Sequence, residues 1–459
     1  MKPLRTLTAR AAAWKALNQC NIFKHDTAEV LGQLLSRTDR PAQATDIVFG
    51  VVRHRGTIDH ILKKCSALES ARVRPSQWNL LRMGVYELVY APKTAEYAVL
   101  NEAVQLSRQA SSKKGAGFIN AVLRNIQRAI ENRQSPLDAK HLQRTVPQTQ
   151  EFGCLFTHDL LPDPEADAAA YFRAAFSLPQ ALVQEWLRAF GEEKTRGVCF
   201  ASNRHPSIIL QPNTLRTTAA DLAEKLQEEG IFNEYLNGMI RIQATGKINT
   251  GLAYQDGLFF IQDVTAANAI NTLAPAPDGT ILDMCAAPGG KCMASAIHMQ
   301  DKGLILASDA AAKRLSKVRG NAKRMRFQSI ETVPASRLEQ AVQKLKRLDA
   351  IILDVPCSNT GVLARRVEAR WRWNPEAVKN LQKIQRELLL KAVSLARPQT
   401  KILYSTCSIQ PEENAGQIQW CLSQNKSVTW LNEKQLFPST RTPHAFDHDG
   451  GYVALLQCK

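Results

Sequence analysis

The sequence lacks any pair of cysteines at the CxxC spacing typical of zinc sites, although ten cysteines are spread over its 459 residues. We therefore expect no metal site. A chain of this length needs no disulfide framework, so most of these cysteines are expected to be small buried residues in a reducing cytoplasm. No stretch approaches ~18 consecutive apolar residues, and a membrane span is therefore not expected.

Acidic residues are in short supply. Lys and Arg number 59 against 42 Asp and Glu, which gives a formal net charge of +17. The surplus is uneven, because residues 1–134 hold 21 of the basic residues and only 10 of the acidic ones. A basic surplus concentrated in one segment favours a polyanionic partner, most simply nucleic acid. The alternative is a solubilising surface without a partner.

The patterns along the chain predict several domains. Residues 1–134 have apolar residues at helical spacing throughout and are predicted to be all-helical. Residues 135–166 are polar and proline-containing and read as a linker, and residues 167–270 read as a small α+β subdomain. Residues 271–459 alternate strand-like and helical runs, which predicts a mostly parallel, doubly wound α/β sheet. Its predicted strands are 280–284, 303–308, 349–354 and 401–406, with edge strands after Asn425.

A glycine-rich turn follows the first of these strands. Pro288-Gly289-Gly290 lets the backbone approach a ligand closely, and the next helix offers free amides there. The turn is not GxGxxG, so a dinucleotide site of the usual type is disfavoured. Asp309 ends the next strand, 19 residues after Gly290, where an acid can hold the hydroxyls of a ribose such as that of S-adenosylmethionine. Alternatively, Asp309 only caps the helix that follows.

Two further strands each end at a cysteine. Cys357 follows the predicted strand 349–354, and Cys407 follows the predicted strand 401–406. Ligands bind outside the carboxyl ends of parallel strands, so both thiols and Asp354 can face one pocket. A carboxylate there can exchange a proton with a bound base. The alternatives are inert core cysteines and a turn-forming aspartate.

A stretch rich in arginine and tryptophan comes after Cys357. Guanidinium and indole groups together suit phosphate contact and base stacking, which predicts an RNA-binding loop; the alternative is a solvated loop with half-buried tryptophans. A second basic cluster on the predicted helix 311–325 can add to RNA contact or can equally be an exposed face with no partner. The first stretch contains Arg365, Arg366, Arg370, Trp371, Arg372 and Trp373.

The motifs together identify a resemblance. The last domain resembles the Sun family of RNA cytosine-5 methyltransferases, which use S-adenosyl-L-methionine. Three segments carry it, in the family's order and spacing: Cys285–Lys291 (CAAPGGK), Asp354–Gly361 (DVPCSNTG) and Thr406–Asn414 (TCSIQPEEN). Segments 49–53, 81–86 and 117–124 resemble the NusB-like helical domain that precedes the catalytic part in the family's small-subunit rRNA enzyme.

The resemblance implies roles for the motif residues. Cys407 is expected to be the nucleophile that adds to carbon 6 of the cytosine, which activates carbon 5 for methylation. Cys357 is expected to help release the product. Asp354 is expected to protonate or hydrogen-bond the ring and to border the cofactor, and Asp309 is expected to be part of the cofactor site. The remaining cofactor site is expected along Cys285, Ala286, Ala287, Pro288, Gly289, Gly290 and Lys291.

One position departs from the family. The family's third motif often has an aspartate near the cofactor's adenine, where this chain has Ala335. The adenine is therefore expected to be held by another group or by backbone. The expected partner is RNA, in the form of 16S rRNA or a small-subunit precursor, with tRNA as the runner-up; protein partners are not indicated. Other classes are a non-catalytic RNA-binding assembly factor and a DNA cytosine methyltransferase in which Cys357 acts alone.

Overall fold

The computed structural model describes residues 6–66, 68, 70–110, 113–242 and 248–459. They form two compact units, Met1–Arg204 with Leu363–Asn374, and His205–Val362 with Pro375–Lys459. We call them the helical unit and the sheet unit. None of the helices in these described ranges is long and apolar enough to cross a bilayer.

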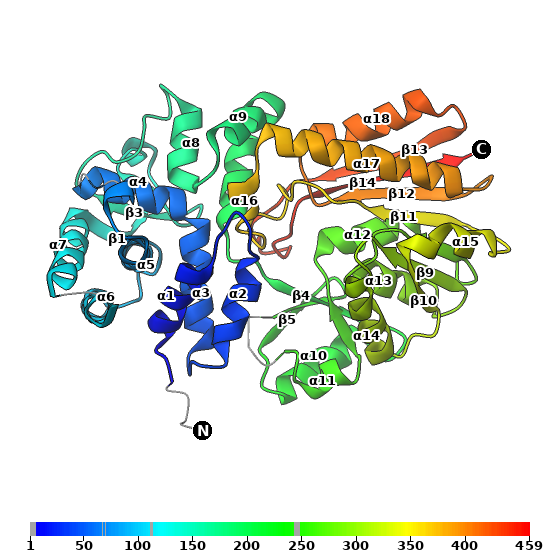
Figure 1. Ribbon diagram of the computed structural model, residues 1–459, viewed down its shortest axis with the longest axis horizontal. Helices are drawn as coiled ribbons and strands as arrows, with labels where there is room; N and C mark the ends of the chain where they lie inside the picture. Colours follow the sequence, from blue (N-terminus) through cyan, green and yellow to red (C-terminus); the bar gives the residue numbers. More distant parts are fainter. Residues whose placement is uncertain (1–5, 67, 69, 111–112, 243–247) are drawn as a thin grey trace. The chain divides into compact units, whose positions relative to one another are not determined.

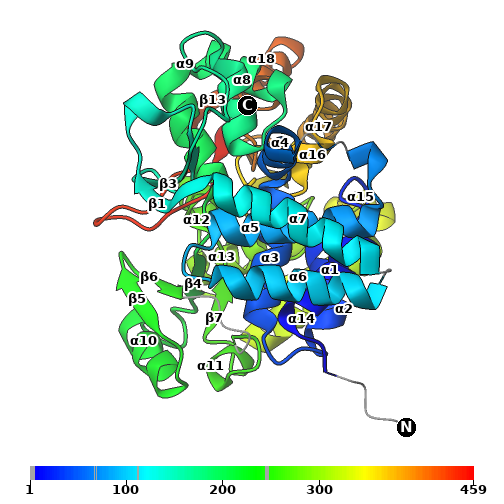
Figure 2. The ribbon, with the colours of Figure 1, turned by 90° about the vertical axis from the view of Figure 1, so that its left-hand side faces the viewer.

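The helical unit is built around α5 (Pro75–Tyr90), which contacts α1, α3, α4, α6 and α7. Most of α5 is buried on all sides, including Leu80, Leu81 and Leu88. Helices that cover a central helix need only one apolar stripe each, which fits the three- and four-residue spacing in the sequence. Figure 2 shows these helices packed together. They are α1 (Ala9–Gln19), α2 (Thr27–Leu35), α3 (Pro41–Arg53), α4 (Arg55–Ser66), α6 (Glu96–Ala110) and α7 (Lys113–Ala129).

The linker predicted for residues 135–166 is instead folded. A three-stranded antiparallel sheet has the order β1-β3-β2, with strands Ile130–Pro136, Phe152–Phe156 and Thr145–Pro147. Val146, Cys154 and Phe156 are fully buried in the core of the helical unit. The prediction was wrong because few apolar residues anchor this sheet. The predicted α+β segment 167–270 also divides, since α8 (Ala168–Phe176) and α9 (Gln180–Asn203) belong to the helical unit.

The arginine–tryptophan stretch is a structural part of the helical unit. Arg370, in α16 (Ala369–Arg372), is fully buried and donates to the carbonyls of Arg53 (3.0 Å) and Ser202 (2.8 Å) and to Asn203 Oδ1 (2.7 Å). Trp371 Nε1 donates to the Val52 carbonyl at 2.9 Å, and Arg372 donates to two further carbonyls. For Arg370 the prediction of RNA contact was wrong, because this side chain is fully buried and bonded within the unit. Arg366, by contrast, is 59% exposed and pairs with Asp26 at 2.9 Å.

The sheet unit contains a seven-stranded sheet of order β10-β9-β8-β11-β12-β14-β13 (Figure 1). The first five strands are parallel, β14 runs antiparallel to β12, and β13 in turn runs antiparallel to β14. This confirms the doubly wound α/β prediction. The strands are β8 (Thr280–Asp283), β9 (Leu304–Asp309), β10 (Ile330–Pro334), β11 (Ala350–Asp354), β12 (Lys401–Thr406), β13 (Val428–Leu436) and β14 (Gly451–Cys458).

Helices cover both faces of this sheet. Successive side chains point to opposite faces, so Ile281 packs in one core and Leu282 in the other. The first core includes α12 (Val264–Leu273), α13 (Gly290–His298) and α14 (Leu315–Met325). The second includes α15 (Leu338–Gln343), α17 (Pro375–Leu395) and α18 (Ala415–Gln424). With both faces covered, the ends of the strands are the open places for a ligand.

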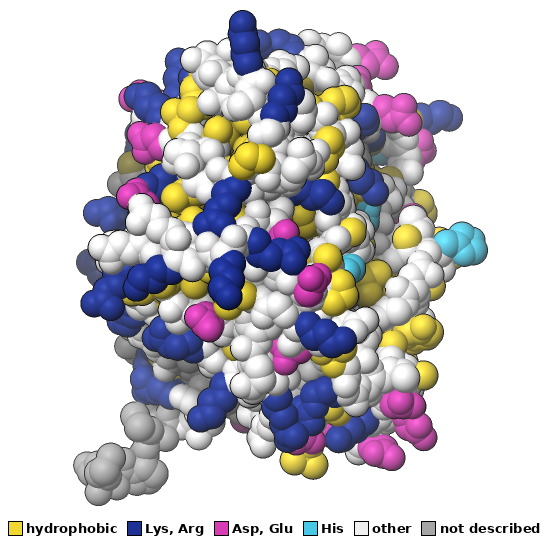
Figure 3. Space-filling view, turned by 90° about the vertical axis from the view of Figure 1, so that its right-hand side faces the viewer, with side chains coloured by type: hydrophobic (Ala, Val, Ile, Leu, Met, Phe, Trp, Pro, Cys, Tyr) yellow, Lys and Arg dark blue, Asp and Glu magenta, His cyan; other side chains and the backbone are white. Residues whose placement is uncertain are grey.

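A small antiparallel sheet precedes the large one. Its order is β5-β6-β4-β7, with strands Asn233–Leu236, Met239–Ile242, Ile208–Pro212 and Phe259–Ile261. Leu210, Leu222 and Ile240 form its core with α10 (Ala219–Glu228) and α11 (Leu252–Gln255). The predicted basic cluster is exposed at Lys317 and Lys323 of α14 and at Lys313 just before this helix. Figure 3 shows many Lys and Arg side chains spread over one face.

Candidate active site

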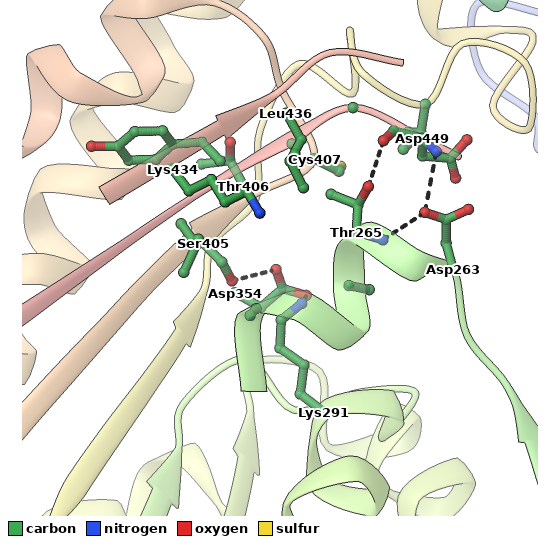
Figure 4. Close-up of a pocket in the computed structure, with 17 residues that line it drawn as sticks. Asp263, Thr265, Lys291, Asp354, Ser405, Thr406, Cys407, Lys434, Leu436 and Asp449 are labelled. Atoms are coloured by element: carbon green, nitrogen blue, oxygen red, sulfur yellow. Dashed lines mark hydrogen bonds and ion pairs between the residues drawn. The ribbon is translucent and has the colours of Figure 1, made fainter. Parts of the chain in front are cut away.

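The carboxyl ends of β8, β11 and β12 meet at one edge of the sheet. The register pairs Asp354 with Ser405 and Ile352 with Asp283, so the residues after each strand lie at the same level. A pocket of about 140 Å³ opens there, with Lys291, Asp354 and Cys407 in its wall (Figure 4). The adjacent lining comes from α12 and from the segment before β14, including Asp263, Thr265, Asp449 and Gly450.

The two predicted cysteines are in contact. Their Sγ atoms lie 3.2 Å apart, and Cys407 Sγ also donates to Asn359 Oδ1 at 3.2 Å. Cys407 lines the pocket, whereas Cys357 is 7% exposed and lies outside the lining. The hydrogen bond with Cys407 and burial raise the pKa of the Cys357 thiol well above its ordinary value. The geometry thus gives the thiols different positions, one at the pocket and one behind it.

Asp354 faces the pocket as one half of an ion pair. Its Oδ2 lies 2.8 Å from Lys291 Nζ, and its Oδ1 accepts from Ser405 Oγ at 3.0 Å. The Lys291 side chain is only 10% exposed, against 41% for Asp354. Burial lowers the pKa of the Lys291 ammonium, but the attraction of Asp354 outweighs it and raises that pKa above its ordinary value. A fixed positive charge therefore lies beside the carboxylate and the nearby Cys407 thiol.

The glycine-rich turn connects β8 to the start of α13. Gly289 has φ of 112°, a conformation that side chains rarely adopt, and a Cβ on Gly290 would lie 3.3 Å from Gln262 Nε2. Gln262 Oε1 is buried and has no hydrogen-bond partner among the described residues. The close backbone and an unused buried acceptor fit a polar cofactor against this loop.

Asp309 lies where the sequence predicts it, at the end of β9. Its carboxylate is 4% exposed and accepts from Ala287 N (3.2 Å) and Ala311 N (2.9 Å). Arg314 pairs with it at 3.4 Å and donates to the Ala287 carbonyl at 2.7 Å. Asp309 therefore bonds the turn that follows it, as a capping residue does, and also lies against the glycine-rich loop; its contact with a ribose stays a prediction.

Beneath the loop lies Asp283, which is 1% exposed. It accepts from Cys292 Sγ and from Cys285 N, each at 3.2 Å. Burial raises the pKa of Asp283 to about 7, and burial likewise raises the pKa of the Cys285 thiol. Asp283 therefore anchors both ends of the loop.

Several pocket residues were absent from the sequence-based prediction. Ser405, Asp263, Asp449 and Lys434 lack any pattern that marks them, because they come from different strands and helices that only the fold brings together. Arg314 was placed in the second basic cluster, as an RNA contact or part of an exposed face, and not at the cofactor loop. Ala335, which replaces the aspartate often found in the family, lies directly after β10. Pro334 of β10 pairs with Asp309, so Ala335 lies near the residue that contacts the glycine-rich loop.

The fold and the site define the class of protein: an α/β methyltransferase that uses S-adenosylmethionine. Comparisons with known proteins specify the family. Residues 270–457 match the family described as 16S rRNA methyltransferase RsmB/F, residues 7–128 match the NusB family, and residues 178–245 match the ferredoxin-like domain of RsmF/B-like methyltransferases. Residues 270–457 thus match the RsmB/F methyltransferases and the other two matches cover much of the remaining chain, which confirms the resemblance to the Sun family.

Relatives extend over nearly the whole chain. The "Probable ribosomal RNA small subunit methyltransferase B" of Synechocystis sp. is 27% identical over 431 residues, which cover 90% of each chain. The "Ribosomal RNA small subunit methyltransferase B" of Cronobacter sakazakii is 25% identical over 459 residues, which cover 98% of this chain and 99% of the relative. The crystal structure of the protein PH0851 shares the fold, with a TM-score of 0.71 and 22% identity over 98% of both chains.

Proposed function

We propose that this protein transfers a methyl group from S-adenosylmethionine to carbon 5 of a cytosine in RNA, and that its substrate is 16S rRNA or a small-subunit precursor. The RNA target is supported by relatives named as small-subunit rRNA methyltransferases. One observation carries the cytosine-5 chemistry: the Cys407 thiol lies in the pocket wall with Asp354, and a second thiol lies 3.2 Å from it.

The reaction begins at Cys407. A cytosine must leave its stack to enter a pocket, where the Cys407 thiolate forms a bond from Sγ to carbon 6. The electrons of the ring then move toward carbon 5 and make it nucleophilic. Asp354, held by Lys291 and Ser405, is placed to hold a proton at ring nitrogen 3 as this charge develops.

The loop after β8 holds the methyl donor in this proposal. When bound, S-adenosylmethionine supplies a methyl group on a positively charged sulfur, and carbon 5 takes that methyl as the sulfur–methyl bond breaks. A water molecule then takes the proton from carbon 5, and the electrons of that bond restore the double bond between carbon 5 and carbon 6. The bond between Sγ and carbon 6 breaks at the same time, and its electrons return to Cys407. Cys357, in contact with Cys407, is placed to assist this release.

The helical unit is proposed to bind the RNA backbone. The basic surplus of residues 1–134 is the supporting observation, since cationic side chains bind phosphates without reading sequence. If the substrate is ribosomal RNA, the protein acts where ribosomal subunits assemble, which is the cytoplasm.

The test is nucleoside analysis of RNA after incubation with the purified protein and S-adenosylmethionine. A 16S rRNA transcript and a small-subunit particle form one arm, and bulk tRNA forms the other. We expect 5-methylcytosine in the first arm with the wild-type protein and with Cys20→Ala, and none with Cys407→Ala. A methyl group on another atom, or retained activity in Cys407→Ala, contradicts the proposal.

A further inference from the structure

A buried carboxylate lies beneath the two thiols. Glu413, at the end of the short turn Pro411–Glu413 after β12, is fully buried. Its Oε1 accepts from Ser358 N at 2.9 Å and from Gln385 Nε2 at 3.0 Å. Its Oε2 accepts from Ser408 Oγ at 2.7 Å and from Ser358 Oγ. In the described part of the chain Glu413 forms no ion pair, so these four donors take the place of a cation.

The donors come from both cysteine loops. Ser358 directly follows Cys357, and Ser408 directly follows Cys407. Gln385 of α17 also donates to the Pro356 carbonyl at 3.0 Å, which holds the first loop on the other side of its cysteine. The two serine hydroxyls are 3.1 Å apart, so one carboxylate joins the two loops directly next to the reacting sulfur atoms.

We propose that Glu413 is a positioning residue that fixes the distance between the thiols of Cys357 and Cys407. At this distance Cys357 can reach the adduct on Cys407. That role in the reaction rests on the proposed function, but the distance between the thiols is independent of it. Shortening the side chain by one methylene moves the carboxylate by more than 1 Å, and misplacement on that scale costs about 10²-fold in a positioned reaction.

The charge on Glu413 also affects the protonation of Cys357. Burial raises the pKa of Glu413, while the hydrogen bonds from Ser358 and Ser408 lower it. The charged groups that face Cys357 are Cys407 and Glu413, and Tyr404 packs against the same site from β12. Glu413 thereby adds to the effects of Cys407 and burial that keep Cys357 protonated.

The distance is measured by disulfide formation with oxidised glutathione. The Cys407 thiolate attacks glutathione disulfide, forms a mixed disulfide and releases one glutathione thiolate. The Cys357 thiolate then attacks the mixed disulfide, forms the Cys357–Cys407 bond and releases the second glutathione thiolate. The rate of the second step relative to the first reports how closely the thiols are held, and an effect on global stability alone does not change it.

Three variants decide the proposal. Glu413→Gln keeps the reach and an acceptor for Ser358 and Gln385, and Glu412→Gln changes the neighbouring, partly exposed acid as a matched control. Glu412→Gln is expected to keep the second-step rate within about 3-fold of wild type. Glu413→Gln is expected to keep at least the wild-type rate, because loss of the charge lets Cys357 lose its proton more readily. Glu413→Asp keeps the charge but loses the reach, and its second step is expected to fall at least 10-fold, with the RNA adduct accumulating in proportion.

A folded Glu413→Asp protein with the wild-type second-step rate overturns the proposal. If Glu413→Asp does not fold, Ser408→Ala removes one of the donors and is judged by the same rate. If the wild-type protein forms no RNA adduct, the proposed function fails, while the disulfide rates still decide the role of Glu413.

Discussion

The ion pair between Lys291 and Asp354 is expected to couple stability and activity at the pocket. In Lys291→Met a chain of similar length replaces the ammonium that lies 2.8 Å from Asp354 Oδ2. Removing one partner of a buried pair costs about 3–5 kcal/mol, because the other charge is left uncompensated. Asp354 is 41% exposed, so water screens the remaining charge and the expected loss is about 1–2 kcal/mol.

A double-mutant cycle measures this coupling. Chemical denaturation of Lys291→Met, Asp354→Asn and the double variant gives the pairwise free energy, with the exposed Lys344→Met as a control. We expect a coupling of about 1–2 kcal/mol, with the double variant more stable than the sum of the single losses predicts. Methylation is expected to fall about 10²-fold or more in every variant that changes Asp354 or Lys291, because a positioned proton donor contributes that much.

The result that refutes this reasoning is specific. A coupling free energy below about 0.5 kcal/mol, within the error of additive sites, means that the two side chains do not form the pair in solution. Methylation at the wild-type rate by Lys291→Met means that the ion pair has no role in the reaction.

Three further predictions concern the rest of the molecule. Because the folded state raises the pKa of Asp283 to about 7, folding stability is lost as pH rises from about 4 to 7. Asp283→Asn is expected to flatten this pH dependence in denaturation curves and to raise the free energy of unfolding at pH 8 by up to about 4 kcal/mol, and an unchanged pH slope contradicts the prediction. Arg370→Lys cannot serve all the buried carbonyls and is expected to lose at least about 3 kcal/mol, seen as a lower Tm; an unchanged Tm argues against the buried contacts. Charge reversal of the exposed Lys63 and Lys64 is expected to weaken RNA binding and to reduce its salt slope by about 2 without changing Tm, and an unchanged slope means that this face does not bind RNA.

The central strands were predictable from the sequence because their burial is nearly complete. β8, β9, β11 and β12 lie where apolar runs predict them. β10 was missed, since this edge strand contains Glu331 and Thr332 and is only partly buried. β14 was expected at an edge but lies between β12 and β13, because a single sequence does not reveal how antiparallel strands are added to a parallel sheet.

The candidate site was predictable where residues follow strands directly. Cys357, Cys407 and Asp354 were placed by the rule that parallel strands end at one edge, and the structure brings them together. Asp449 depends on tertiary packing and lacks a local pattern. Glu413 lies within the motif Thr406–Asn414, but only the fold shows that it contacts both cysteine loops. Arg370 illustrates the opposite error, since composition alone does not distinguish an arginine bonded to buried carbonyls from one exposed to bind RNA.

The central claim is a covalent bond between Cys407 and the target cytosine. The most direct measurement is a denaturing gel of the protein with RNA and S-adenosylmethionine, followed by mass analysis of the linked peptide. We predict that Cys357→Ala accumulates a band in which Cys407 carries the cytidine, and that Cys407→Ala forms none. A band that persists in Cys407→Ala and disappears in Cys357→Ala contradicts the account, because the two thiols then have the opposite roles.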